Sequence, residues 1–131
     1  MLFKNHAPLI LLASIFLFVG CASSNQVLNY NNAQVKSRSA TISNKDMRRA
    51  IILAGTNSGW QMQEVKQGLV NATKFNTGHM AKVEITYNTK NFSINYVDSS
   101  NFQYDGTTIH KTYNKWVKVL YRNISKNLSR L

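Results

Sequence analysis

Apolar residues recur at helical spacing in two segments of the chain, and each stripe predicts an amphipathic helix. The first stripe comprises Met47, Ala50, Ile51 and Ala54. Ser43 followed three residues later by Asp46 is typical of a capping box, so we expect this helix to begin there and to end near Gly55 and Gly59. The second stripe predicts a longer helix over about 108–128. Its members are Ile109, Tyr113, Trp116, Val117, Leu120, Ile124 and Leu128.

Between the two helices the pattern changes to an alternation of apolar and polar residues, which is typical of half-buried strands. Residues 79–87 alternate most clearly. The other predicted strands are residues 60–66, 69–75 and 92–96. Residues 98–106 are expected to form a polar loop with Phe102 and Tyr104 as anchors. The pattern predicts an α+β fold of order α-β-β-β-β-α, in which both helices pack on the apolar face of a four-stranded antiparallel meander.

The first 43 residues lack such a pattern and divide into two parts. A basic start precedes an unbroken apolar run over residues 9–19. As a helix this run is about 16 Å long, too short to cross about 30 Å of bilayer hydrocarbon. A basic start, a short apolar run and a small residue at its end predict a cleaved secretory signal peptide over residues 1–20. Residues 21–43 are rich in Ser, Asn, Gln and Ala and are expected to be a flexible tether with a reach of about 25 Å. The folded domain is then 44–131.

The one cysteine of the chain follows directly after the predicted signal peptide. Phe18, Val19 and Gly20 precede Cys21, and this order resembles the lipobox of bacterial lipoproteins, with Phe18 where Leu is usual. The resemblance implies cleavage before Cys21 and acyl chains on its sulfur and its new amino group, which together give a lasting membrane anchor. Ala22 in place of Asp implies the periplasmic side of the outer membrane rather than the inner membrane. The alternative is an ordinary signal peptide followed by a free thiol.

The mature chain as a whole resembles the small lipoproteins of Gram-negative bacteria. The likeness lies in the lipobox at Cys21, the Gly59-Trp60 step, the Val83-x-Ile85-x-Tyr87 and Ser93-Ile94-x-Tyr96 strands and the Ile109-His110-x-x-Tyr113-Asn114-x-Trp116 segment. The resemblance implies a location in the cell envelope and an α+β architecture, and it names no activity.

The charge balance points to anionic partners. The chain has 16 Lys and Arg against 5 Asp and Glu, a formal net charge of +11. Five of the cations lie opposite the apolar stripe of the predicted last helix: Lys111, Lys115, Lys118, Arg122 and Lys126. Such a face suits anionic lipid, lipopolysaccharide or an envelope protein, and the alternative is a solvated face. A periplasmic location argues against nucleic acid as the partner, because nucleic acid is mostly absent from the periplasm.

The sequence offers little material for catalysis. His79 and His110 each stand alone, without Cys, His or a carboxylate at metal-ligand spacing, and no phosphate loop or dinucleotide fingerprint occurs. We therefore expect a non-enzymatic binding or accessory protein without a metal or cofactor. A carrier of a small apolar or lipid-like ligand is the alternative. Its pocket, between the sheet and the last helix, would be lined by Trp60, Tyr96, Tyr113 and Trp116, residues that equally suit a packed core.

Overall fold

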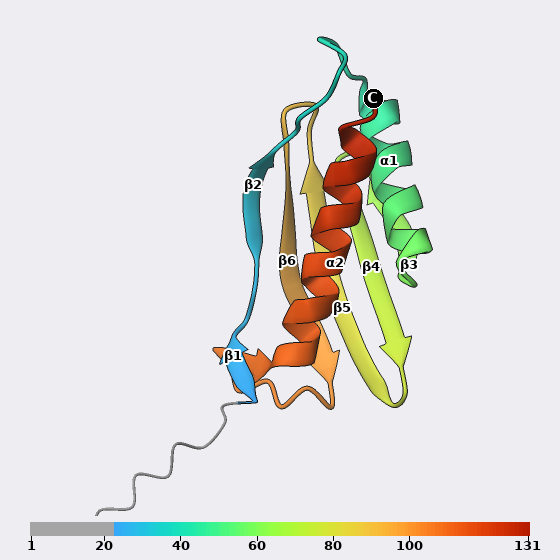
Figure 1. Ribbon diagram of the computed structural model, residues 1–131. Coiled ribbons are helices and arrows are strands. Elements are labelled where there is room, and N and C mark those ends of the chain that lie inside the picture. Colours follow the sequence, from blue (N-terminus) through green and yellow to red (C-terminus); the bar gives the residue numbers. More distant parts are fainter. Residues whose placement is uncertain (1–22) are drawn as a thin grey trace, which may run out of the picture.

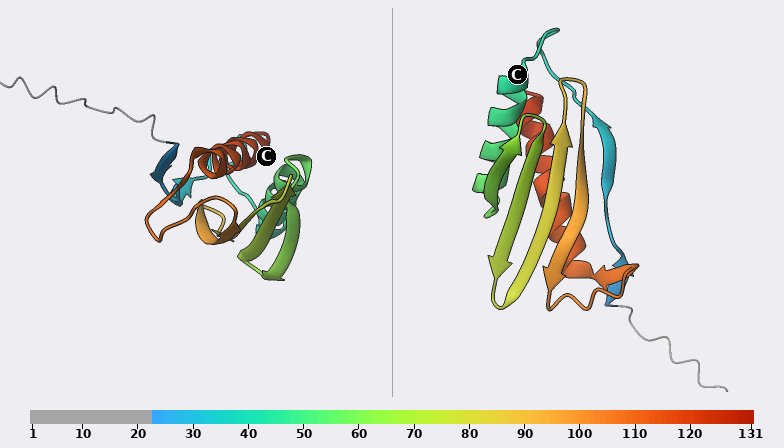
Figure 2. Two further views of the ribbon diagram at one scale, coloured as in Figure 1. Left: turned by 90° about the horizontal axis from the view of Figure 1, so that it is seen from below. Right: turned by 180° about the vertical axis from the view of Figure 1, so that it is seen from behind.

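A five-stranded antiparallel sheet forms one layer of the protein, and two helices form the other (Figure 1). The computed structural model describes residues 23–131. In sheet order the strands are β2 (Tyr30–Gln34), β6 (Asn91–Ser100), β5 (His79–Tyr87), β4 (Leu69–Asn76) and β3 (Gln61–Lys66). A separate two-stranded ribbon pairs β1 (Ser24–Gln26) with β7 (Thr108–His110). The helices α1 (Asn44–Asn57) and α2 (Lys111–Leu128) lie side by side on one face of the sheet (Figure 2).

The predicted capping box is confirmed at the start of α1. The hydroxyl of Ser43 accepts a hydrogen bond from the backbone N–H of Asp46 at 3.1 Å, and the Asp46 carboxylate accepts from the Ser43 N–H at 3.2 Å. At the other end, the Ser58 N–H donates to carbonyls of the last turn, and Gly59 follows with a φ of +82°. Glycine has no Cβ and adopts this left-handed conformation at little steric cost. The chain can therefore turn at Gly59 and continue into β3.

The alternation along β5 is confirmed and determines which face of the sheet is covered. Ala81, Val83 and Ile85 are fully buried beneath the helices, whereas Lys82 and Glu84 between them point to the other face and are partly exposed. The buried stripe of α2 packs on this apolar face, and α1 packs against α2 and β3. Figure 2 shows the opposite face of the sheet without a covering layer. One apolar and one polar face were expected from the sequence, and the structure has both.

The predicted four-stranded meander is wrong, because the sheet has a fifth strand. This strand, β2, comes from the segment expected to be a flexible tether, and it pairs with β6. Its sequence, YNNAQ, shows no readable alternation, and its register shifts between Tyr30 and Ala33. The strand is held by its neighbours: the Tyr30 ring stacks on Tyr121 of α2 with centroids 4.0 Å apart. Tertiary contact, not local pattern, therefore creates β2.

The rest of the N-terminal segment is also held against the domain. Its strand β1 pairs with β7, so α2 begins at Lys111 instead of at about 108. At the end of β1 the Asn114 NH₂ donates to the Gln26 carbonyl, and beyond β1 the Leu28 N–H donates to the Asn114 carboxamide oxygen, both at 2.9 Å. The Lys111 N–H donates to the Ser23 carbonyl at 3.0 Å. From Ser23 onward, the expectation of a flexible tether is therefore corrected.

Candidate functional site

Five exposed cations form a single row along the outer side of α2, which we call the basic row. Its members are Lys111, Lys115, Lys118, Arg122 and Lys126. The helix buries the opposite side, including Val117, Leu120 and Ile124, against the sheet. At about 1.5 Å per residue, the row extends about 22 Å along the helix. The predicted placement of these residues opposite the apolar stripe is confirmed.

The basic row has no carboxylate partner among residues 23–131. Within that range, the ion pair recorded joins Arg48 of α1 to Glu64 of β3, on another part of the surface. The sequence of α2 itself contains no Asp or Glu. The positive charges of the row therefore repel one another without local compensation, and an anionic partner would relieve this repulsion.

The first part of the basic row borders a groove between α2 and β1. The groove has a volume of about 340 Å³. It is lined by Asn25, Lys111, Thr112, Asn114, Lys115 and Lys118. The Asn114 carboxamide is already used by Gln26 and Leu28, which leaves the three lysines, the Thr112 hydroxyl and the Asn25 carboxamide to contact a ligand. Such a group of donors suits phosphate or carboxylate oxygens.

Three of the four aromatic residues predicted to line a pocket meet in the structure, but they are packed against one another. The Tyr113 ring lies 5.5 Å from Tyr96 and 6.0 Å from Phe102, and Phe102 lies 5.0 Å from Trp116. Phe102, expected to be a loop anchor, is thus the centre of the cluster. Trp60 is buried in the core and makes none of these ring contacts. The four residues therefore serve as core, and the carrier alternative gains no support from their arrangement.

Burial of Tyr113 has an electrostatic consequence. Its side chain is fully buried, and its hydroxyl has no hydrogen-bond partner among the described residues. Desolvation by burial, with smaller effects from Tyr96 and Tyr104, raises the pKa of Tyr113 far above its ordinary value. The phenol therefore stays neutral to a higher pH than an exposed tyrosine, and its ring packs in the aromatic cluster.

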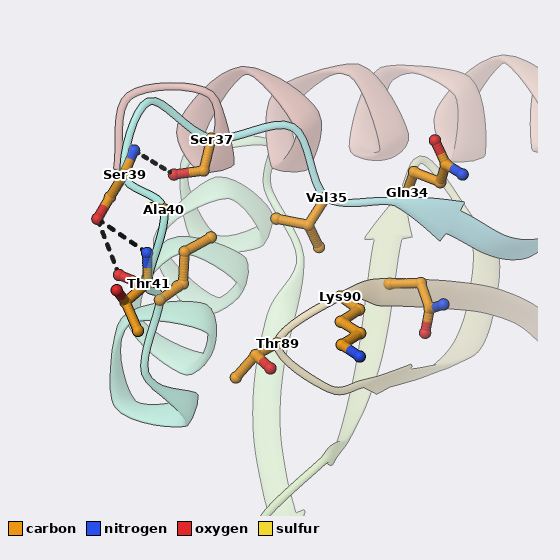
Figure 3. A pocket seen from close by; sticks show the side chains of 10 residues that line it. Gln34, Val35, Ser37, Ser39, Ala40, Thr41, Thr89 and Lys90 are labelled. Carbon is orange, nitrogen blue, oxygen red and sulfur yellow. Dashed lines mark hydrogen bonds between the residues drawn. The ribbon is translucent and has the colours of Figure 1, made fainter.

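A second hollow lies at the opposite end of the molecule, between residues 35–42 and the turn that joins β5 to β6 (Figure 3). Its volume is about 550 Å³. The Ser39 hydroxyl donates to the Thr41 carbonyl at 2.8 Å, and the Ser39 N–H donates to the Ser37 hydroxyl at 3.0 Å. These polar groups are used within the loop itself, and Lys90 is the charged residue in the lining. The arrangement offers no pair of groups for acid–base chemistry.

Each of the two histidines in the described chain has a local structural role. His110 precedes α2, and its Nδ1 accepts a hydrogen bond from the Thr112 N–H at 3.2 Å. Nδ1 of His79 lies 3.1 Å from the Thr77 carbonyl in the β4–β5 turn. Residues 23–131 contain no cluster of three or more His, Cys, Asp or Glu side chains that could hold a metal ion. No helix in this part of the chain is both long and apolar enough to cross a membrane.

No protein-family model, curated protein or solved structure matches this chain. The resemblance to small Gram-negative lipoproteins therefore stays a prediction. Cys21, the predicted lipidation site, lies outside the described residues. The basic row and the path of the N-terminal segment are the features of the described residues that bear on function.

Proposed function

We propose that this protein is a lipid-anchored, non-enzymatic binding protein of the bacterial envelope. Cys21 would hold it to the periplasmic side of the outer membrane, and the basic row would bind an anionic partner. The observation that carries the proposal is the row itself: five exposed cations on one helix face, with no carboxylate partner among residues 23–131.

The size of the expected interaction is substantial. Each Lys or Arg close to an anionic surface contributes about 1 kcal/mol, so a partner that contacts the whole row would gain about 5 kcal/mol, and a surface that meets only part of the row would gain less. Physiological salt limits such interactions to about 8 Å, and binding through the row should therefore weaken steeply as salt is added.

The anchor is tested by replacing Cys21 with serine in the full chain. Without the thiol, no acyl chain can be attached, and we expect the protein to move from the membrane fraction to the soluble periplasmic fraction. If the Cys21→Ser protein stays in membranes after a high-salt wash, the lipidation proposal is wrong.

The basic row is tested with the soluble fragment 22–131, which contains both sheets and both helices. We expect it to sediment with vesicles containing phosphatidylglycerol or lipopolysaccharide at low salt, and not with phosphatidylcholine vesicles. Combined Lys115→Glu, Lys118→Glu and Arg122→Glu substitutions should abolish this binding and leave the fold intact, because all three side chains are exposed.

A matched control is a second triple variant that makes the same change in net charge elsewhere on the surface. Lys45, Lys66 and Lys90 are exposed and lie outside α2. Their combined replacement by glutamate should leave most of the binding. If both triple variants lose binding equally, net charge alone is responsible and the row is not a site. If the unmodified fragment binds no anionic vesicle, headgroups are excluded, and acidic envelope proteins become the partner to test.

A further inference from the structure

One end of the molecule, which we call the entry end, brings together three segments that are distant in the sequence. It holds β1, the β4–β5 turn and the loop 101–107 (Figure 1). The loop joins the other two: the N–H of Val27, directly after β1, donates to the Thr107 carbonyl at 3.0 Å, and the Phe102 ring lies 5.0 Å from that of His79. Both views of Figure 2 are consistent with this grouping.

The entry end carries the two large aromatic side chains that are exposed in the described chain. Phe75, at the end of β4, is 63% exposed, and Tyr104, in the loop, is 40% exposed. The other large apolar side chains that are exposed are aliphatic: Leu53, Val65 and Val97. An exposed aliphatic residue is common on protein surfaces, whereas aromatic residues at one end of a molecule are typical of a membrane interface.

The two aromatic residues differ in how far neighbouring groups hold their side chains. Phe75 lies opposite Met80 in the β4–β5 pair, and the two border a shallow hollow of about 530 Å³ at the tip of the hairpin. Tyr104 lies against Tyr96 with centroids 4.2 Å apart, and its hydroxyl donates to the Gly106 carbonyl at 3.2 Å. Little conformational entropy would therefore be lost when Tyr104 enters the membrane interface, because its ring and its hydroxyl are already held.

The charges at the entry end are compatible with an anionic surface. Lys111 and Lys115, at the start of α2, are exposed. The acidic residue of the loop, Asp105, directs its carboxylate to the N–H groups of Thr107 and Thr108, at 2.9 and 2.6 Å. The β4–β5 turn, Asn76-Thr77-Gly78, contains no acidic residue.

We propose that the entry end docks on the lipid leaflet that holds the acyl chains of Cys21, with Phe75 in the interfacial layer. This inference depends on the proposed anchor. Ser23 follows Cys21 by two residues, so their Cα atoms lie at most about 7 Å apart. Figure 1 shows β1 and the β4–β5 turn on opposite sides of the entry end. These two separated contacts restrict the orientation, and with the loop 101–107 also on the leaflet the sheet and α2 extend away from the membrane.

This orientation changes what the basic row can reach. Lys111 lies beside the membrane, whereas Lys126 lies about 22 Å farther along α2, beyond the headgroups. The far part of the row would then be accessible to a partner in the periplasm, while the near part contacts lipid.

The docking is tested with the fragment 21–131, coupled through its one cysteine to a maleimide lipid in vesicles of phosphatidylethanolamine and phosphatidylglycerol. This coupling replaces the natural anchor, so the result does not depend on lipidation in the cell, which the Cys21→Ser fractionation tests. Phe75→Trp places a reporter at the entry end, and Thr89→Trp places one in the β5–β6 turn at the opposite end. Lipids brominated near the top of the acyl chain quench a tryptophan that reaches them.

We expect bromolipid to quench the Phe75→Trp protein more than the unsubstituted protein, whose Trp60 and Trp116 provide the background. The Thr89→Trp protein should match the background. Equal quenching of the two variants would overturn the proposed orientation.

A second measurement uses the uncoupled fragment 22–131. Phe75→Ser should lower its partition onto the same vesicles about tenfold, equivalent to about 1.4 kcal/mol. Leu53→Ser, a change at a similarly exposed aliphatic residue on α1, should have little effect. The proposal is overturned if both variants lose the same amount. It is also overturned if Phe75→Ser leaves partition unchanged and converts a dimer to a monomer in ultracentrifugation, because the patch is then a contact between two copies.

Discussion

Replacing Asn114 by alanine should loosen the N-terminal segment on α2, although the Lys111–Ser23 hydrogen bond and the Tyr30–Tyr121 stack remain, and should leave the remainder of the fold in place. The Asn114 side chain is 8% exposed, and its two hydrogen bonds are made to the backbone at the end of β1 and just beyond it. It accepts from the Leu28 N–H and donates to the Gln26 carbonyl, each at 2.9 Å. The helix and the segment are joined at this point by the side chain, so alanine removes the connection.

The magnitude follows from the number of bonds and from the exposure of the groups left behind. Two hydrogen bonds with a net value of about 0.5–1.5 kcal/mol each give about 1–3 kcal/mol. Because Gln26 is exposed and Leu28 is only half-buried, water can reach both backbone groups after the change. We therefore expect a loss of about 1–2 kcal/mol, which raises the fraction of molecules with an open segment by a factor of about 5–30.

Amide hydrogen exchange on the fragment 22–131 measures this local opening. The amides of Val27 and Leu28 should exchange faster by that factor, while those of β4 and β5 should be unchanged. Asn127→Ala is a matched control on the same helix, because it removes the hydrogen bond from Asn127 to the Ala50 carbonyl at 3.2 Å. It should not affect the N-terminal segment. Unchanged exchange at Leu28 in the Asn114→Ala protein would refute the reasoning.

Three further predictions concern single residues that stabilise a helix start, a loop and a turn. Ser43→Ala removes the cap of α1 and should cost about 1 kcal/mol, seen as a fall of about 4–8 °C in Tm; an unchanged Tm would show that the cap is redundant. Hydrogen bonds from the Thr108 N–H and hydroxyl lower the pKa of Asp105 from its ordinary value of 3.8 to about 2. The stabilisation is therefore present above pH 3.8 and is lost as the pH falls toward 2. Carboxyl NMR titration should find this low pKa, and Asp105→Asn should remove that part of the acid dependence. Gly68, in the β3–β4 turn, has a φ of +86°, and an added Cβ would lie 3.1 Å from the Tyr87 carbonyl oxygen. Gly68→Ala should therefore cost about 1 kcal/mol or more in chemical denaturation, and a neutral result would contradict the strain argument.

The sequence by itself determined those features whose information is local. Helical spacing and a cap at Ser43 define α1, and strict alternation over residues 79–87 defines the buried face of β5. The basic row could also be predicted, because the spacing of its residues places them on one face of any helix that contains them. For such features the spacing of the apolar residues shows which face of the element is buried, whatever the neighbouring elements are.

Only the tertiary structure decided the features that depend on a partner. The strand β2 carries no periodic pattern, and it forms because β6 offers unpaired backbone groups and Tyr121 offers a ring for Tyr30. Phe102 is the centre of an aromatic cluster because the loop 101–107 folds back under α2. The placement of Phe75 at the same end of the molecule as β1 likewise depends on strand order. A sequence pattern describes which face of an element avoids water, whereas the neighbour that covers or extends that face is chosen by the whole fold.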